Sequence, residues 1–194
     1  MPKSEHLPTT HAKDRSEWRK WLEKHATSSG VWLSYYKKGS SKPSVSYDEA
    51  VEEALCFGWI DSRVNALDDQ RYMQFFSPRK PKSSWSKLNK QRVEQLIQNG
   101  LITATGLEKI AAAKRDGSWN ALDAIEDLQL SADLVEALDS NKMAADNFIA
   151  FSTSVKKNIV RWIESAKQPE TRLKRIAETV TLAAQNIKAY PYGR

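Results

Sequence analysis

Two prolines, Pro78 and Pro81, mark the point at which the pattern of the sequence changes. Before them, short runs rich in aromatic and β-branched residues alternate with helical patterns. From about residue 86 onward, apolar residues recur at helical spacing almost to the end of the chain. This change predicts an α+β fold, in which a small antiparallel sheet of about three strands with helices is followed by an all-helical C-terminal half.

Three runs of β-forming residues predict the strands, at residues 31–36, 59–64 and 71–76. The linker between the last two is short enough to join them as an antiparallel hairpin. The predicted parts of the chain are a flexible tail at residues 1–12, an N-terminal α+β part at 13–85 and a C-terminal helical part at 86–194. We expect either one compact unit or two closely packed subdomains.

Capping residues predict where helices begin. Asp14 is followed by Glu17, and Ser46 by Glu49, a spacing at which side chains and backbone groups at a helix start satisfy each other. Helical patterns in the C-terminal half cover residues 86–99, 105–114, 120–127, 131–138, 140–150, 154–167 and 170–188. An apolar stripe along one of these is formed by Val155, Ile159, Trp162, Ile163 and Ala166.

The chain has 194 residues and one cysteine, Cys56, so it forms no internal disulfide and suits a reducing compartment. Its first residues contain no apolar run typical of a signal peptide. No window approaches the roughly 20 apolar residues that cross a bilayer. We therefore expect a cytoplasmic protein without membrane insertion.

Charged residues are gathered in blocks. Residues 71–92 carry seven cationic and no acidic side chains, although the whole chain nets only +6. Residues 116–139 carry seven acidic side chains and no Lys or Arg, and residues 156–175 carry seven cationic and two acidic ones. Such blocks either neutralise each other within the fold or face outward and steer partners. The sequence leaves both interpretations open.

Few residues are suited to catalysis or metal binding. The three histidines are scattered, and His25 lies on the apolar face of the first predicted helix, which favours a packing role. Cys56 lies between Leu55 and Phe57, where burial makes a thiol inert. The chain has no metal-ligand spacing and no glycine-rich phosphate loop. We expect no cofactor, no metal and no enzymatic activity.

Asp61 is the candidate for a small pocket. In an ideal strand Trp59, Asp61 and Arg63 point to the same side. An aspartate beside an arginine either braces the sheet as an ion pair or lines a binding pocket, and both alternatives stay open here.

The first basic block supplies the main candidate binding surface, with Arg79, Lys80, Lys82, Trp85 and Lys87 as its residues. Cations suit phosphates and an exposed indole can stack on a base. A tryptophan this near a helix start is also commonly packed against the core, and a solvated basic face is an equal alternative. Arg172 and Arg175 are further candidates, because cations at a helix start oppose the helix dipole and so indicate an acidic partner.

Segments along nearly the whole chain resemble the bacteriocin-protection, YdeI/OmpD-associated (OmdA-like) family. The resemblance is carried by residues 55–61 (LCFGWID), 76–87 (FSPRKPKSSWSK) with Asn89 and residues 92–93, and 162–167 (WIESAK) with residues 170–172 and 175–176. It implies a small bacterial protein linked by name to bacteriocin tolerance and to an outer-membrane porin. The family supplies no established catalytic residues.

The leading hypothesis is therefore a non-enzymatic protein of bacteriocin protection or stress tolerance that acts by binding through this basic and aromatic surface. Its partner would be an acidic protein surface or a nucleic acid. A nucleic-acid-binding protein is the alternative. A small-molecule enzyme with a pocket around Asp61 and Arg63 comes third.

Overall fold

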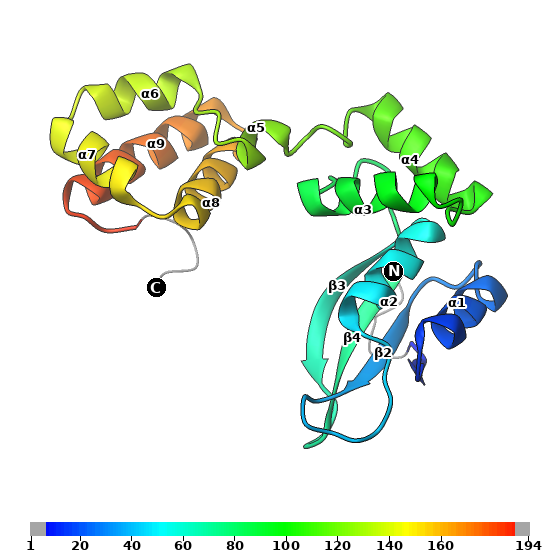
Figure 1. Cartoon of the computed structure of the whole chain (residues 1–194). Helices are drawn as coiled ribbons and strands as arrows, with labels where there is room; N and C mark the ends of the chain where they lie inside the picture. The colour runs from blue at the N-terminus through cyan, green and yellow to red at the C-terminus, as the bar shows by residue number, and fades with distance from the viewer. Residues whose placement is uncertain (1–6, 189–194) are drawn as a thin grey trace. The chain divides into compact units, whose positions relative to one another are not determined.

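The computed structural model describes residues 7–188 and divides the chain into two compact units, residues up to Ala121 and residues from Leu122 onward (Figure 1). The N-terminal unit contains a sheet and four helices within its described residues, and the C-terminal unit is helical there. The predicted α+β class, with helices following the sheet, is confirmed.

The sheet has four strands, not the three expected, in the order β1-β2-β4-β3. The strands are β1 (Thr9–His11), β2 (Val31–Tyr36), β3 (Trp59–Ala66) and β4 (Arg71–Pro78). The extra strand, β1, lies in the segment predicted to be a flexible tail, and it pairs in parallel with β2 through Thr10 and Leu33. The remaining tail residues, 1–6, lie outside the described residues. A three-residue strand was missed because its partner lies more than twenty residues away and its own sequence has little strand pattern.

Helices α1 (Arg15–Lys24) and α2 (Tyr47–Cys56) begin at the predicted caps. The Asp14 carboxylate accepts from Glu17 N, and Ser46 and Glu49 form a complete capping box. Their apolar faces share a core with β2 and β4, which contains Trp18, Leu22, Val31, Leu33, Ala54, Leu55 and Phe76. The predicted packing role of His25 is consistent with its ring, which stacks on Trp21 at 4.2 Å between centroids.

Helices α3 (Lys87–Gln98) and α4 (Ala104–Asp116) belong to the N-terminal unit, so this unit ends at Ala121 and not near residue 85 as expected. Both helices contribute to the first core, through Val93, Leu96, Ile110 and Ala113. The α4 start is fixed to the α2 end, because Thr103 Oγ1 donates to Cys56 O at 2.8 Å. Gly106 belongs to the same contact, since a Cβ there would lie 2.3 Å from Cys56 O.

The C-terminal unit consists of α5 (Asp123–Glu126), α6 (Ala132–Asp139), α7 (Lys142–Ala150), α8 (Thr153–Glu164) and α9 (Pro169–Ala184) within the described residues. Helix α9 contacts α6, α7 and α8. The predicted stripe of α8 is confirmed, because Ile159 and Ile163 are fully buried in the second core with Leu134, Phe148 and Ile176. The predicted helix at 120–127 is only the single turn α5.

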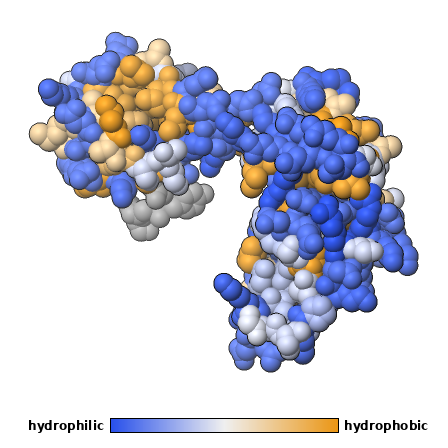
Figure 2. All heavy atoms as spheres, viewed as in Figure 1, coloured by the Kyte–Doolittle hydropathy of each residue, from blue (hydrophilic) through white to orange (hydrophobic). Residues whose placement is uncertain are grey.

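Both units expose large apolar side chains, which in the N-terminal unit are Tyr47, Val64, Leu67, Leu88, Ile97 and Leu107. Apolar residues gather on the visible face of the C-terminal unit, whereas the sheet-containing part of the N-terminal unit is largely hydrophilic on the side shown (Figure 2). The large apolar side chains exposed in the C-terminal unit are Val135, Met143, Ile149, Leu173 and Ile187. Among residues 7–188, none of the helices combines the length and the apolar character needed to cross a membrane.

Candidate anion-binding site

The first basic block leaves the sheet at the end of β4 and reaches α3 through a tight turn. Arg79 N donates to Gly58 O at 2.9 Å, which holds the start of the turn against the end of α2. Ser83 N then donates to Lys80 O at 3.3 Å, with Pro81 and Lys82 between them. Lys82 has a φ of 60°, in the left-handed region that favours glycine, and its N–H donates to the Asp116 carboxylate.

The candidate residues of this block divide into buried and exposed ones. Lys80, Lys82 and Lys87 are exposed, while Arg79 is 4% exposed and Trp85 only 1%. The Trp85 indole packs in the first core and lies 5.0 Å from Trp119 between ring centroids. Trp85 therefore follows the alternative in which the indole packs against the core, and it offers no accessible platform for stacking.

Arg79 is a buried cation whose hydrogen bonds are incomplete. Its guanidinium lies over the Trp85 ring, with Cζ 3.6 Å from the ring centroid, and Nη2 donates to Ser84 O at 2.6 Å. The N–H groups on Nε and Nη1 are buried and have no acceptor. A buried donor without an acceptor costs about 1–3 kcal/mol, and more when the group is charged. Burial lowers the pKa of Arg79 to about 10, and the negative charge of Asp61 partly opposes this lowering.

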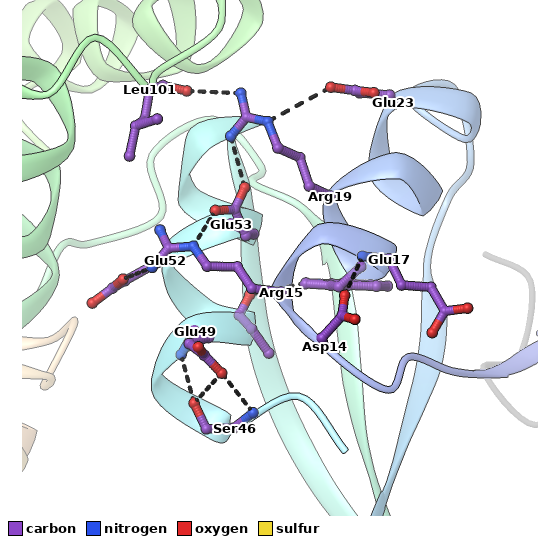
Figure 3. A network of polar contacts seen from close by, with 12 residues as sticks. Asp14, Arg15, Glu17, Arg19, Glu23, Ser46, Glu49, Glu52, Glu53 and Leu101 are labelled. Carbon is purple, nitrogen blue, oxygen red and sulfur yellow. Dashed lines mark hydrogen bonds and ion pairs between the residues drawn. The ribbon is translucent and has the colours of Figure 1, made fainter. Parts of the chain in front are cut away.

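A second buried ion in the same unit shows how the fold normally treats such a group. Glu53 on α2 is 2% exposed, and Figure 3 shows Arg15 and Arg19 reaching it from α1. Arg19 Nη1 donates to one carboxylate oxygen at 2.7 Å and Arg15 Nε to the other at 2.5 Å. Both oxygens of Glu53 are thus satisfied inside the protein, whereas Arg79 has no carboxylate partner among the described residues.

Arg79 also lines a small open cavity of about 60 Å³, although its unmatched Nε and Nη1 atoms are themselves buried. The cavity lies between the turn and the C-terminal part of α4, and it is lined by Arg79, Lys80, Pro81, Lys82, Ser83, Trp85, Lys109, Ala112, Ala113, Asp116 and Ser118. Ser118 Oγ is also buried without a hydrogen-bond partner. A cavity of this size holds one small polar group.

The charges around the cavity favour an anion. Its lining has four cationic side chains, those of Arg79, Lys80, Lys82 and Lys109, against the single carboxylate of Asp116. The C-terminal end of α4 also opposes an anion, by about 0.3–1 kcal/mol for a helix dipole. That effect is smaller than the cost of leaving a buried guanidinium unsatisfied. The arrangement can therefore take up a small anionic group, with Arg79 and Ser118 as donors.

The two remaining basic candidates lie in the other unit, and each donates to several acceptors there. Arg172 on α9 donates from Nε and Nη2 to both oxygens of Asp133, at 2.6 and 3.0 Å, and also to Ser131 and Glu164. Arg175 donates to Trp162 O and Ser165 Oγ and lies over the Trp162 ring. Within residues 122–188, part of the acidic block is thus neutralised by the second basic block.

Trp59, Asp61 and Arg63 do not share one face of the sheet. Strand β3 is irregular between Asp61 and Val64, where the register shifts against β4. Asp61 pairs with Phe76, and its Oδ2 accepts from Tyr47 Oη and Gln74 Nε2. Arg63 lies instead over the rings of Trp32 and Phe75. Phe75 precedes Phe76 in β4 and therefore points to the opposite face of the sheet. The β-bulge reverses the alternation that an ideal strand would give.

The other chemistry-bearing residues have structural surroundings. Cys56 is fully buried, and burial raises the pKa of its thiol to about 11. Among residues 7–188, His, Cys, Asp and Glu side chains form no group of three that would hold a metal ion.

Sequence reasoning missed the residues that α4 and the segment after it contribute to the cavity, among them Lys109, Asp116 and Ser118. They lie about thirty residues after the basic turn, and nothing in their own pattern separates them from an ordinary helix end. Asp116 was placed in the acidic block, but its role in holding Lys82 N follows only from the way that α4 packs.

Comparison with known families divides the chain where the structure does. Residues 10–109, just over half of the chain, match the family described as a domain of unknown function (DUF8412). The chain belongs to this family. Residues 127–186 match the family described as Bacteriocin-protection, YdeI or OmpD-Associated, which confirms the resemblance for the C-terminal unit and its segment at 162–176. The segments at 55–61 and 76–93 fall within the first match. No curated protein and no solved structure matches the chain.

Proposed function

We propose that this protein acts by binding, without catalysis, and that the turn at residues 79–83 is its contact surface for an anionic partner. The observation that carries this proposal is Arg79, a buried cation whose Nε and Nη1 donors are unmatched beside an open cavity. Exposed Lys80 and Lys82 flank it, and Lys87 follows at the start of α3. The fold thus provides partners for both oxygens of the buried Glu53 carboxylate, whereas two donors of the buried Arg79 guanidinium have no acceptor.

An acidic protein surface is the partner that we favour. Recognition of single-stranded nucleic acid depends largely on aromatic side chains that stack on bases, and Trp85 is 1% exposed. The protective role named in the description of the C-terminal family would then follow from capture of an acidic partner by the N-terminal unit. In this mechanism the residues of the turn bind the partner and catalyse no reaction.

The test measures binding of dye-labelled polyglutamate to the full chain by fluorescence anisotropy at low and at moderate salt. The variant Lys80→Glu/Lys82→Glu should lower the affinity at least about tenfold and flatten its salt dependence, because two of the cations that face the ligand are reversed. The matched control is Lys167→Glu/Lys174→Glu, which makes the same change at exposed positions of the C-terminal unit. It should change the affinity less than about twofold.

Two outcomes would decide against an acidic protein partner. Equal affinity in the wild type and in the Lys80/Lys82 variant would remove the turn as a contact surface. Tighter binding to labelled DNA or RNA than to polyglutamate, weakened alike for every sequence by the same variant, would assign the surface to nucleic acid instead.

A further inference from the structure

We propose that the cavity beneath the turn is a binding site for a phosphate group, held by the Nε and Nη1 donors of Arg79 and by Ser118 Oγ. This inference rests on the proposed function in one respect, namely that the basic turn faces an anion. It adds that the cavity beneath the turn takes a phosphate group, while the exposed Lys80 and Lys82 remain the contacts for the carboxylates of an acidic protein surface. The ligand enters a space of about 60 Å³, so it is inorganic phosphate or the terminal phosphate of a larger molecule.

The donor set argues for a buried receptor and not for a diffuse basic surface. Arg79 is held in place at both ends, because its backbone N–H donates to Gly58 O and its guanidinium lies over the Trp85 ring. Nη2 is occupied by Ser84 O, which leaves Nε and Nη1 as the donors for a ligand. An arginine whose planar donors are fixed before binding suits the several oxygens of an oxyanion.

The charge of the lining argues for phosphate over a carboxylate. Four cations and one carboxylate line the cavity, so the local excess favours a ligand with more than one negative charge. A phosphate monoester is mainly dianionic near neutral pH, inorganic phosphate is then a mixture of the mono- and dianion, and either has enough oxygens to accept from both Arg79 and Ser118 at once. A carboxylate has one charge and two oxygens, and would leave more of the lining uncompensated.

The experiment follows the side-chain Nε–H signals of the full chain by ¹H–¹⁵N NMR during titration with sodium phosphate, at constant ionic strength. The expected result is a saturable shift of one arginine signal, the one that is absent in Arg79→Met. Arg79→Met should weaken phosphate binding, measured by calorimetry, at least about tenfold, and Ser118→Ala should weaken it about two- to tenfold. Lys174→Ala in the C-terminal unit is the control and should bind as the wild type does.

Different ligands separate the sources of the phosphate. Methyl phosphate binding at least as tightly as inorganic phosphate supports a site for a terminal phosphomonoester, and binding of inorganic phosphate alone supports a site for the free ion. Tighter binding of acetate than of either would overturn the assignment to phosphate.

Other results reject the cavity as the site. An unchanged Arg79 signal, or equal phosphate affinity in the wild type, Arg79→Met and Ser118→Ala, would do so. If Arg79→Met does not fold, Ser118→Ala and the NMR signal of wild-type Arg79 still decide the question. If phosphate does not bind in the cavity but the Lys80/Lys82 variant still loses polyglutamate binding, this inference is rejected and the proposed function stands. Phosphate binding at Arg79 without any effect of that variant on polyglutamate would do the reverse.

Discussion

Arg79 in the N-terminal unit and Arg172 in the C-terminal unit belong to two basic blocks that look alike in sequence, yet their surroundings differ. Arg172 is partly exposed and donates to Asp133, Ser131 and Glu164. Arg79 is buried, donates to one backbone oxygen, and keeps Nε and Nη1 unmatched. The comparison teaches that the number of cations in a segment does not locate a binding site. The acceptors around each cation decide whether its donors are satisfied, and only the folded chain reveals them.

The largest effect is expected from the two tryptophans on which arginines rest. Trp85→Ala should lower the free energy of unfolding by about 3–5 kcal/mol, because Trp85 is fully buried in the first core. Trp162→Ala should cost about 1–2 kcal/mol, since Trp162 is only partly buried beside the second core. Urea unfolding followed by far-ultraviolet circular dichroism measures both. Equal losses would mean that the Arg79–Trp85 pair is no more deeply embedded than Arg175–Trp162.

The comparison is sharpest when both arginines receive the same substitution. Arg172→Met should lower the free energy of unfolding by about 1–2 kcal/mol, because it leaves Asp133 without its bidentate partner in a partly exposed pair. Arg79→Met should raise the free energy of unfolding by about 1–2 kcal/mol in buffer free of phosphate, since it removes a buried charge that lacks acceptors. A loss of stability in both variants would contradict the distinction between them.

The smallest effect concerns pH. The Arg172 guanidinium, with the Ser131 hydroxyl, holds the pKa of Asp133 well below its usual range. A carboxyl with a lower pKa in the folded than in the unfolded state stabilises the fold above about pH 4, and this stabilisation is lost as the pH falls further. We expect a contribution of about 1 kcal/mol, because Asp133 is more than one-third exposed.

The measurement is urea unfolding between about pH 5 and pH 2. The variant Asp133→Asn should be less stable than the wild type at pH 5 and should lose less stability on acidification. An identical pH slope in the variant would show that the stability is set by other carboxyls.

The helices were largely predictable because their signals are local. Asp14 and Ser46 bond to groups three residues away, so the sequence around them contains both partners. The α8 stripe was predictable for the same reason, since helical spacing brings Ile159 and Ile163 to one face. Strand β1 and the inclusion of α3 and α4 in the first unit depend on contacts between distant segments, which no short window contains.

The candidate site was predictable only in part. The basic block identified Arg79, Lys80 and Lys82, but its pattern predicted a surface and gave no sign that Arg79 is buried. Ser118 was invisible, because its position at the cavity depends on where α4 ends. The expectation that Trp59, Asp61 and Arg63 share one face was wrong, because one irregular residue in β3 reversed the faces that follow it.

The turn at Lys82 has a consequence for the rate at which a ligand enters. Pro81 has a fixed φ, Lys82 is held in the left-handed region, and two hydrogen bonds from Ser83 close on Lys80 O. Because Lys82 N also donates to the Asp116 carboxylate, the backbone at the rim of the cavity has few conformations available. A ligand can associate with such a preformed rim without a closing motion. A flexible loop would lose conformational entropy on binding, whereas this turn has already lost that entropy on folding.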